Sequence, residues 1–193
     1  MATEKKKSED SGPVLAKELL RARSILLFGV IEPKTTKQVV TQLLALNRMS
    51  STEPIRVYVN SPGGHADDGF AIYDVMRYVT APVHTIVTGL AASAATIVMI
   101  GADKGGRLAL PNSRIMLHQP SQGARGTASD IAITAREILR LRKKANELFA
   151  EETGHPVDKI EKDMHRDFWM TADEAVEYGL VDKIVPHEAD LPS

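Results

Sequence analysis

Short apolar runs alternate with longer amphipathic segments along most of the chain. The apolar runs are rich in isoleucine, valine and leucine, and they predict strands at Ile25–Val30, Ile55–Asn60, Val83–Thr88 and Arg114–His118. The segments between them have apolar residues at helical spacing, and they predict helices at Thr36–Arg48, Ala66–Val79 and Ala91–Ile100. Regular alternation of strand and helix indicates an α/β fold with a largely parallel sheet.

The last third of the chain has a different pattern. Thr127–Thr153 predicts one long amphipathic helix that ends at Gly154, and short helices are expected at Val157–Met164 and Thr171–Tyr178. A helix of this length is typical of a projecting arm that carries oligomer contacts. An equally common arrangement is a helix that lies on its own domain, and the pattern alone does not separate the two.

The beginning of the chain is polar. Residues 1–12 are charged and lack an apolar stretch, which predicts a disordered tail and argues against a secretory signal peptide, so the folded domain is expected at 13–193. The most apolar stretch, Ile86–Gly101, is interrupted by polar residues and is shorter than the roughly 20 apolar residues of a membrane span. It predicts a buried helix in a protein with no membrane partner.

Charge and cysteine content narrow the function. The 24 Lys and Arg residues against 25 Asp and Glu give a net charge of −1, so no basic field is available to recruit nucleic acid. The absence of cysteine excludes disulfides, thiolate nucleophiles and cysteine-based zinc sites, and it is compatible with a cytoplasmic location. The spacing of His65, Asp67 and Asp68 does not converge on one ion, and no nucleotide-binding motif is present, so neither metal nor cofactor is expected.

Three isolated residues could carry chemistry. Ser93 lies among small residues where an apolar helix is predicted to open, His118 closes a strand, and Asp167 follows Arg166. A histidine at a strand end is well placed to be a general base. The alternative readings are a helix-capping serine, a structural histidine and an exposed ion pair, and each is more common for such a residue taken alone.

Two glycines follow a predicted strand in the turn Asn60–Gly64. Gly63 and Gly64 permit positive φ and leave backbone N–H groups uncovered, which suits a nest for a developing negative charge. An ordinary tight turn is the other reading.

Several segments, taken in order, resemble the signatures of the Clp peptidase family. They are Tyr58–Gly64, Gly89–Ser93, Leu110–Pro120, Ala135–Leu139, Arg166–Asp167 and Glu174–Asp182. The resemblance spans about residues 14–186. It implies a crotonase-like fold, a superhelical stack of ββα units with a protruding handle helix at about 127–153.

The resemblance also implies a serine endopeptidase mechanism. Ser93 would be the nucleophile, His118 the general base and then acid, and Asp167 the group that orients the imidazole. The N–H groups of Gly64 and Ala94 would form the oxyanion hole. The expected peptide-binding residues are Gly63, Gln119, Pro120, Gln122, Gly123, Ala124 and Arg125, with Gly123–Ser129 as a strand that pairs with substrate.

At the level of assembly, the resemblance implies a homo-oligomer of two stacked heptameric rings that encloses the active sites. Arg166 would pair across the ring interface and couple assembly to the alignment of the active site. An AAA+ unfoldase of the ClpX, ClpA or ClpC type would feed unfolded polypeptides into the chamber.

The chain departs from the family pattern at three places. Ala94 replaces a usual methionine, Gln122 replaces a common glycine, and a polar N-terminus replaces the apolar pore segment, which affects gating and unfoldase docking. Apolar positions of the family's docking clefts are retained at Tyr58, Tyr78, Ile86 and Leu110. Two alternatives remain: a crotonase-type acyl-CoA hydratase or isomerase, and a non-catalytic ring subunit.

Overall fold

The computed structural model describes residues 12–121, 123 and 125–192. The helices are α1 (Gly12–Arg21), α2 (Pro33–Met49), α3 (Ala66–Tyr78), α4 (Ala94–Met99), α5 (Ala128–Thr153), α6 (Val157–Asp163), α7 (Ala172–Glu177) and the 3₁₀ turn η1 (Glu188–Asp190). The strands are β1 (Ser24–Phe28), β2 (Ile55–Ser61), β3 (Val83–Ala92), β4 (Arg107–Ala109), β5 (Arg114–Leu117), β6 (Phe168–Thr171) and β7 (Lys183–Ile184).

All seven strands belong to one sheet. The order β1-β2-β3-β4-β7 is parallel throughout, β5 also pairs with β3 in parallel, and β6 pairs with β5 in the antiparallel sense. The long β3 makes both connections because β4 pairs with its first half and β5 with its last residues. The α/β class with a largely parallel sheet, predicted from the alternating pattern, is confirmed.

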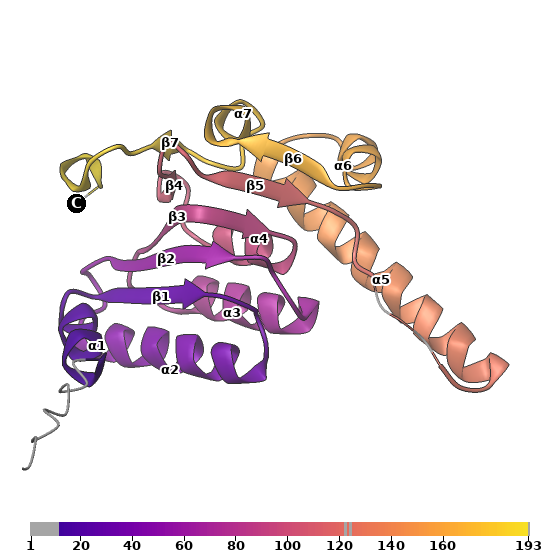
Figure 1. Ribbon diagram of the computed structural model, residues 1–193, viewed down its shortest axis with the longest axis horizontal. Helices are drawn as coiled ribbons and strands as arrows, with labels where there is room; N and C mark the ends of the chain where they lie inside the picture. Colours follow the sequence, from indigo (N-terminus) through magenta and orange to yellow (C-terminus); the bar gives the residue numbers. More distant parts are fainter. Residues whose placement is uncertain (1–11, 122, 124, 193) are drawn as a thin grey trace, which may run out of the picture.

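The core lies between the sheet and the helices α2, α3 and α4, which cover one of its faces (Figure 1). The alternation along β1 shows this, since Ile25 and Leu27 are fully buried whereas Leu26 and Phe28 are exposed. Alternate side chains of a strand point to opposite faces, so the helix-covered face of β1 is dry and its other face is open in the isolated chain.

The long helix α5 extends away from the body of the molecule (Figure 1). Its buried residues, Ala145, Asn146 and Phe149, all lie near its C-terminal end. Nearer its N-terminus, Ile131 and Ile133 are about half exposed. Of the two arrangements open at the level of sequence, the structure therefore has the projecting arm, held only at its base.

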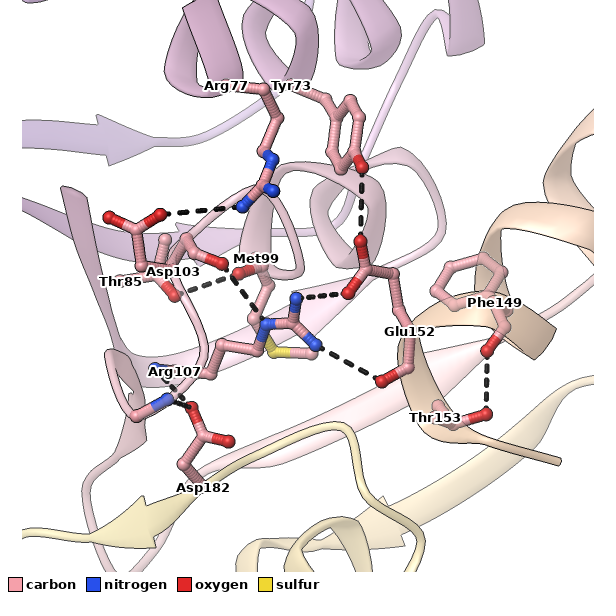
Figure 2. A network of polar contacts seen from close by, with 12 residues as sticks. Tyr73, Arg77, Thr85, Met99, Asp103, Arg107, Phe149, Glu152, Thr153 and Asp182 are labelled. Atoms are coloured by element: carbon pink, nitrogen blue, oxygen red, sulfur yellow. Dashed lines mark hydrogen bonds and ion pairs between the residues drawn. The ribbon is translucent and has the colours of Figure 1, made fainter. Parts of the chain in front are cut away.

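A buried polar network fixes that base (Figure 2). Arg107 of β4, 1% exposed, donates to the carboxylate and the main-chain oxygen of Glu152 in the last turn of α5. Tyr73 of α3 donates to the other carboxylate oxygen of Glu152, at 3.2 Å. Asp182 accepts from the backbone N–H of Arg107 at 2.9 Å. Three elements that are distant in sequence, α3, β4 and α5, thus meet at the Glu152 carboxylate.

Some boundaries differ from the predictions. Ala91 and Ala92 belong to β3, so the helix expected at Ala91–Ile100 begins only at Ala94, and the first part of the stretch predicted as a buried helix is strand. A run of small apolar residues fits the apolar spacing of a helix as well as that of a strand. Here the pairing of β3 with β5 selects the strand. The helix α1 and the strands β4, β6 and β7 were not predicted.

The segment expected to be a substrate-pairing strand is also different. Within Gly123–Ser129, Ala128 and Ser129 already belong to α5, and Thr127 caps that helix through a capping box with Asp130. Gln122, Ala124 and residues 1–11 of the expected tail lie outside the described residues, while Gly12 begins α1. No helix in the described part of the chain is both long and apolar enough to span a bilayer.

Candidate active site

Three strand ends bring Ser93, His118 and Asp167 together. Ser93 follows β3 and His118 follows β5, and because these strands are parallel their carboxyl ends lie at the same edge of the sheet. Asp167 precedes β6, whose antiparallel ladder with β5 ends at the pair Leu117 and Phe168. The next position along that register places His118 opposite Asp167.

The side chains form a continuous hydrogen-bonded chain. His118 Nε2 lies 2.7 Å from Ser93 Oγ, and His118 Nδ1 lies 3.1 Å from Asp167 Oδ1. With Nδ1–H donating to the carboxylate, Nε2 is free to accept the hydroxyl proton. The Asp167 side chain is 62% exposed in the isolated chain, whereas that of His118 is 27% exposed.

Ser93 occupies a sharp turn between β3 and α4. Its φ of 55° and ψ of −127° fall where residues other than glycine are rare, at a typical cost of about 1–3 kcal/mol. The turn is held by the Ser93 N–H, which donates to Met116 O at 2.9 Å, and by the Thr96 hydroxyl, which donates to Ser93 O. Ser93 is the N-cap residue of α4, yet its hydroxyl makes no capping bond and bonds to His118 instead.

The glycine turn packs against this serine. Gly63 has a φ of 90°, and a Cβ at this position would lie 2.6 Å from Ala92 O and 2.8 Å from Ser93 Cβ. The N–H of Gly63 donates to the buried hydroxyl of Ser61 at 3.0 Å. The sequence of the turn did not indicate that Ser61 holds Gly63 in this way. Only a residue without a side chain permits this approach.

Two backbone N–H groups lie near Ser93, those of Gly64 and Ala94. Gly64 is held by a bridge to Ile31, where a Cβ would lie 2.0 Å from Ile31 O. Ala94 is the first residue of α4, so its N–H has no intrahelical acceptor. Among the described residues, neither the Gly64 nor the Ala94 N–H has a hydrogen-bond acceptor. Both are therefore free to bind an oxyanion.

Substitution of Gly63 tests how closely the turn must approach Ser93. We expect Gly63→Ala to lower kcat for a fluorogenic peptide by roughly 100-fold, because displacing a reacting group by about 1 Å has effects of that size. Gly105→Ala is the matched control: it also has a φ of 90°, but its Cβ would meet nothing within 4 Å. Equal losses in both variants would attribute the effect to backbone strain and contradict the steric argument.

A cavity of about 700 Å³ opens beside Ser93 and His118. Apolar side chains of α4, of α5 and of the residue after α6 form part of its wall: Ile97, Ile138, Leu141, Ala145, Phe149 and Met164. Its rim includes Asp67 and Asp68 at the start of α3, together with His65, whose Nδ1 lies 3.1 Å from Asp68 Oδ2. The apolar part of the wall suits an apolar side chain of a substrate.

The expected peptide-binding residues are placed in different ways. Pro120 lines the cavity, and Gly63 lies against Ser93. Gly123 and Arg125 are exposed in the segment that leads to α5. The side chain of Gln119 donates to His165 O. Arg166 is exposed and forms no ion pair within the described part of the chain.

An aromatic cluster that the sequence pattern did not reveal includes Phe168, the first residue of β6 and the neighbour of Asp167. The ring of Phe168 lies 5.4 Å from that of Tyr178, and Tyr178 donates its hydroxyl to Asp163 at 2.7 Å. Burial and the neighbouring Asp163 carboxylate raise the pKa of Tyr178, so it remains a proton donor. Phe168 and Tyr178 are separated in sequence by the rest of β6 and by α7, and no local pattern identifies their contact.

Comparisons with known proteins agree on the family. The Clp protease family model matches residues 7–188. The chain is 45% identical to ATP-dependent Clp protease proteolytic subunit 2 of Treponema denticola, over 98% of this chain and 94% of that protein. It is 47% identical to proteolytic subunit 3 of Rhizobium etli, over 90% and 89% of the two chains.

A solved structure shows the same fold. A mutant ClpP1 from Listeria monocytogenes superposes with a TM-score of 0.84 at 37% identity, covering 91% of this chain and 98% of that chain. The crotonase-like fold with a projecting helix, implied by the resemblance of the motifs, is thereby confirmed. The match of the whole fold and of nearly the whole sequence means that this chain belongs to the Clp protease family of serine-type peptidases.

Proposed function

We propose that the chain cleaves peptide bonds of unfolded polypeptides through an acyl-enzyme formed on Ser93. The observation that carries this proposal is the position of His118, which bridges the Ser93 hydroxyl and the Asp167 carboxylate at 2.7 and 3.1 Å. A serine hydroxyl is a weak nucleophile until an adjacent base accepts its proton, and His118 is the one base in contact with it among the described residues.

Each chemical step has a group to perform it. Ser93 Oγ attacks the peptide carbonyl as its proton passes to His118 Nε2, and the oxyanion accepts hydrogen bonds from the Gly64 and Ala94 N–H groups. When this intermediate collapses, the C–N bond breaks and His118 gives the proton to the leaving amine. Water activated by His118 then attacks the ester and restores Ser93. Asp167 keeps the imidazole oriented throughout.

The substrate is proposed to lie across the cavity as an extended chain. Gly63 and the main chain of the segment from Gln119 to Arg125 would contact its backbone, and Pro120 and the apolar wall would receive a side chain. Gln122, Gly123 and Ala124 belong to the same proposal.

The protein is proposed to act as two stacked heptameric rings in the cytoplasm, with the α5 arms interleaved between them. The exposed apolar residues Ile131, Ile133 and Leu139 support this, since side chains of this kind on a projecting helix suit burial against another subunit. A Clp-type AAA+ unfoldase would supply unfolded chains, and the open face of β1 and β2 offers apolar residues near Tyr58 to such a partner.

Charge reversal at Arg166 tests whether assembly and catalysis are coupled. We expect Arg166→Glu to convert most particles to single rings or smaller species and to lower peptide hydrolysis at least about tenfold, because a buried charge at an interface is costly without its partner. Arg48→Glu, an exposed arginine of α2, is the matched control. Mass photometry and a fluorogenic peptide assay measure the two effects, and unchanged mass and rate would remove the proposed role of Arg166.

A fluorophosphonate probe tests the proposed function directly. The expected result is a single adduct that peptide mass spectrometry places on Ser93, with parallel loss of peptide hydrolysis. The family assignment does not favour an acyl-CoA hydratase or a non-catalytic ring subunit. Lack of labelling, or an adduct elsewhere, would contradict the proposed nucleophile.

A further inference from the structure

The chain leaves the active site after His118, forms the α5 arm, and returns to the same place before Asp167. Gln119 connects the two ends. Its backbone N–H donates to Met164 O at 2.7 Å, and its side-chain Nε2 donates to His165 O at 2.8 Å. The second bond ends two residues before Asp167.

These bonds bracket the pair formed by His118 and Asp167. On one side, the ladder of β5 and β6 ends at Leu117 and Phe168. On the other side, Gln119 is bonded to Met164 and His165. The His118 imidazole and the Asp167 carboxylate therefore lie between two sets of hydrogen bonds that join the same two segments of chain.

Asp167 has little else to hold it. Its side chain is 62% exposed, and within the described residues its carboxylate contacts only His118. The position of the carboxylate therefore depends on the backbone that carries it. The ladder holds the C-terminal side of that backbone at Phe168, and the bonds of Gln119 hold its N-terminal side.

We propose that the side chain of Gln119 is a positioning residue for catalysis, which acts on the imidazole through the loop that carries Asp167. The inference rests on the proposed roles of His118 and Asp167. Gln119 binds the loop backbone rather than the Asp167 side chain, so it stabilises the position of the carboxylate without changing the reacting atoms.

Two substitutions remove the donor while keeping the length of the side chain. Gln119→Met lacks the amide, and Gln119→Glu replaces the donor by an acceptor facing His165 O. We expect each to lower kcat roughly 10- to 100-fold with KM changed less than about twofold, since a misplaced orienting group impairs the chemical step more than substrate binding. Gln38→Met, at an exposed glutamine of α2, is the matched control and should leave both constants unchanged.

A double-mutant cycle with Asp167→Ala separates positioning from a general structural role. If Gln119 acts through Asp167, Gln119→Met should cost less than about twofold in fluorophosphonate acylation once Asp167 is absent. An equal loss in both backgrounds would overturn the proposal. So would a rise in KM at unchanged kcat, because it would assign the side chain to substrate binding.

Hydrogen exchange provides a readout that does not need activity. In the intact assembly, Gln119→Met should speed exchange at residues 164–167 while exchange in β1 and β2 stays unchanged. Unaltered exchange at 164–167 would contradict the proposal even if the rate fell. The two proposals fail in different experiments. Failure of the fluorophosphonate to label Ser93 in the wild-type protein would refute the proposed function, whereas the exchange data test only the role of Gln119.

Discussion

Ser93→Ala is expected to lower peptide hydrolysis by roughly 10⁴-fold or more, the largest effect of any single change in the chain. The hydroxyl is the group that bonds covalently to the substrate, and losing a nucleophile removes the acyl-enzyme route completely. Residual catalysis from the oxyanion N–H groups and from binding would remain far below the wild-type rate. The measurement is kcat for a fluorogenic peptide on the purified assembly.

The control for this substitution is Ser51→Ala, which makes the same chemical change at an exposed loop position. It should leave the rate within experimental error. Alanine is accommodated at position 93 as serine is, so the Ser93 variant should assemble with unchanged mass. Turnover above about a hundredth of the wild-type rate in that variant would contradict the nucleophile assignment.

Arg107→Met is expected to have the largest effect on stability, about 3–5 kcal/mol. The guanidinium lies beneath the base of α5, where it neutralises Glu152, a carboxylate whose side chain is only 10% exposed (Figure 2). Removing one partner of a buried pair leaves the other charge without compensation, at a cost of this size. The cost should appear as a melting temperature lowered by at least about 6 °C in circular dichroism.

Two further variants isolate the cause of that loss. Arg21→Met removes an arginine of α1 that pairs with Glu18 on the surface, and it should cost less than about 1 kcal/mol. Adding Glu152→Leu to Arg107→Met removes the uncompensated charge and should recover part of the stability. Burial and the Glu152 carboxylate raise the pKa of Tyr73, so its hydroxyl stays protonated. In the double variant this hydroxyl loses its acceptor, Glu152, which is why only part of the stability should be recovered. A double variant less stable than Arg107→Met would contradict the charge argument.

The hydrophobic pattern was sufficient to predict the layers of the fold but not the details that build the active-site edge. The strands at Ile25, Ile55 and Val83 are long, apolar and β-branched, and the structure has strands there. In contrast, β4 contains the buried Arg107, and β6 is a four-residue strand next to charged residues, so neither has a strand pattern of its own. Such short strands form because a neighbouring strand provides hydrogen-bonding partners.

The site could be assigned from sequence only through the resemblance of the motifs. No spacing rule relates Ser93, His118 and Asp167, because their contact depends on a parallel pairing of β3 with β5 and on an antiparallel register of β5 with β6. The positive φ of Ser93 was equally hidden, since its neighbours are alanines that favour a helix. The small residues around Ser93 and the glycine turn were visible in the sequence, but nothing in the sequence showed that the turn packs against Ser93.

The return of the chain to Gln119 has a consequence for how this protein could change through evolution. Everything from Pro120 to His165 is an excursion whose two ends lie side by side, closed by hydrogen bonds of 2.7 and 2.8 Å. The reacting groups lie at those ends, and the base of α5 adds Ile138, Leu141, Ala145 and Phe149 to the cavity wall, whereas the exposed outer part of the arm, with Ile131 and Ile133, does not line the cavity. This outer part can therefore be lengthened, shortened or given a new contact surface as a separate module. Subunits with different assembly partners can diverge in this way around one unchanged set of reacting groups.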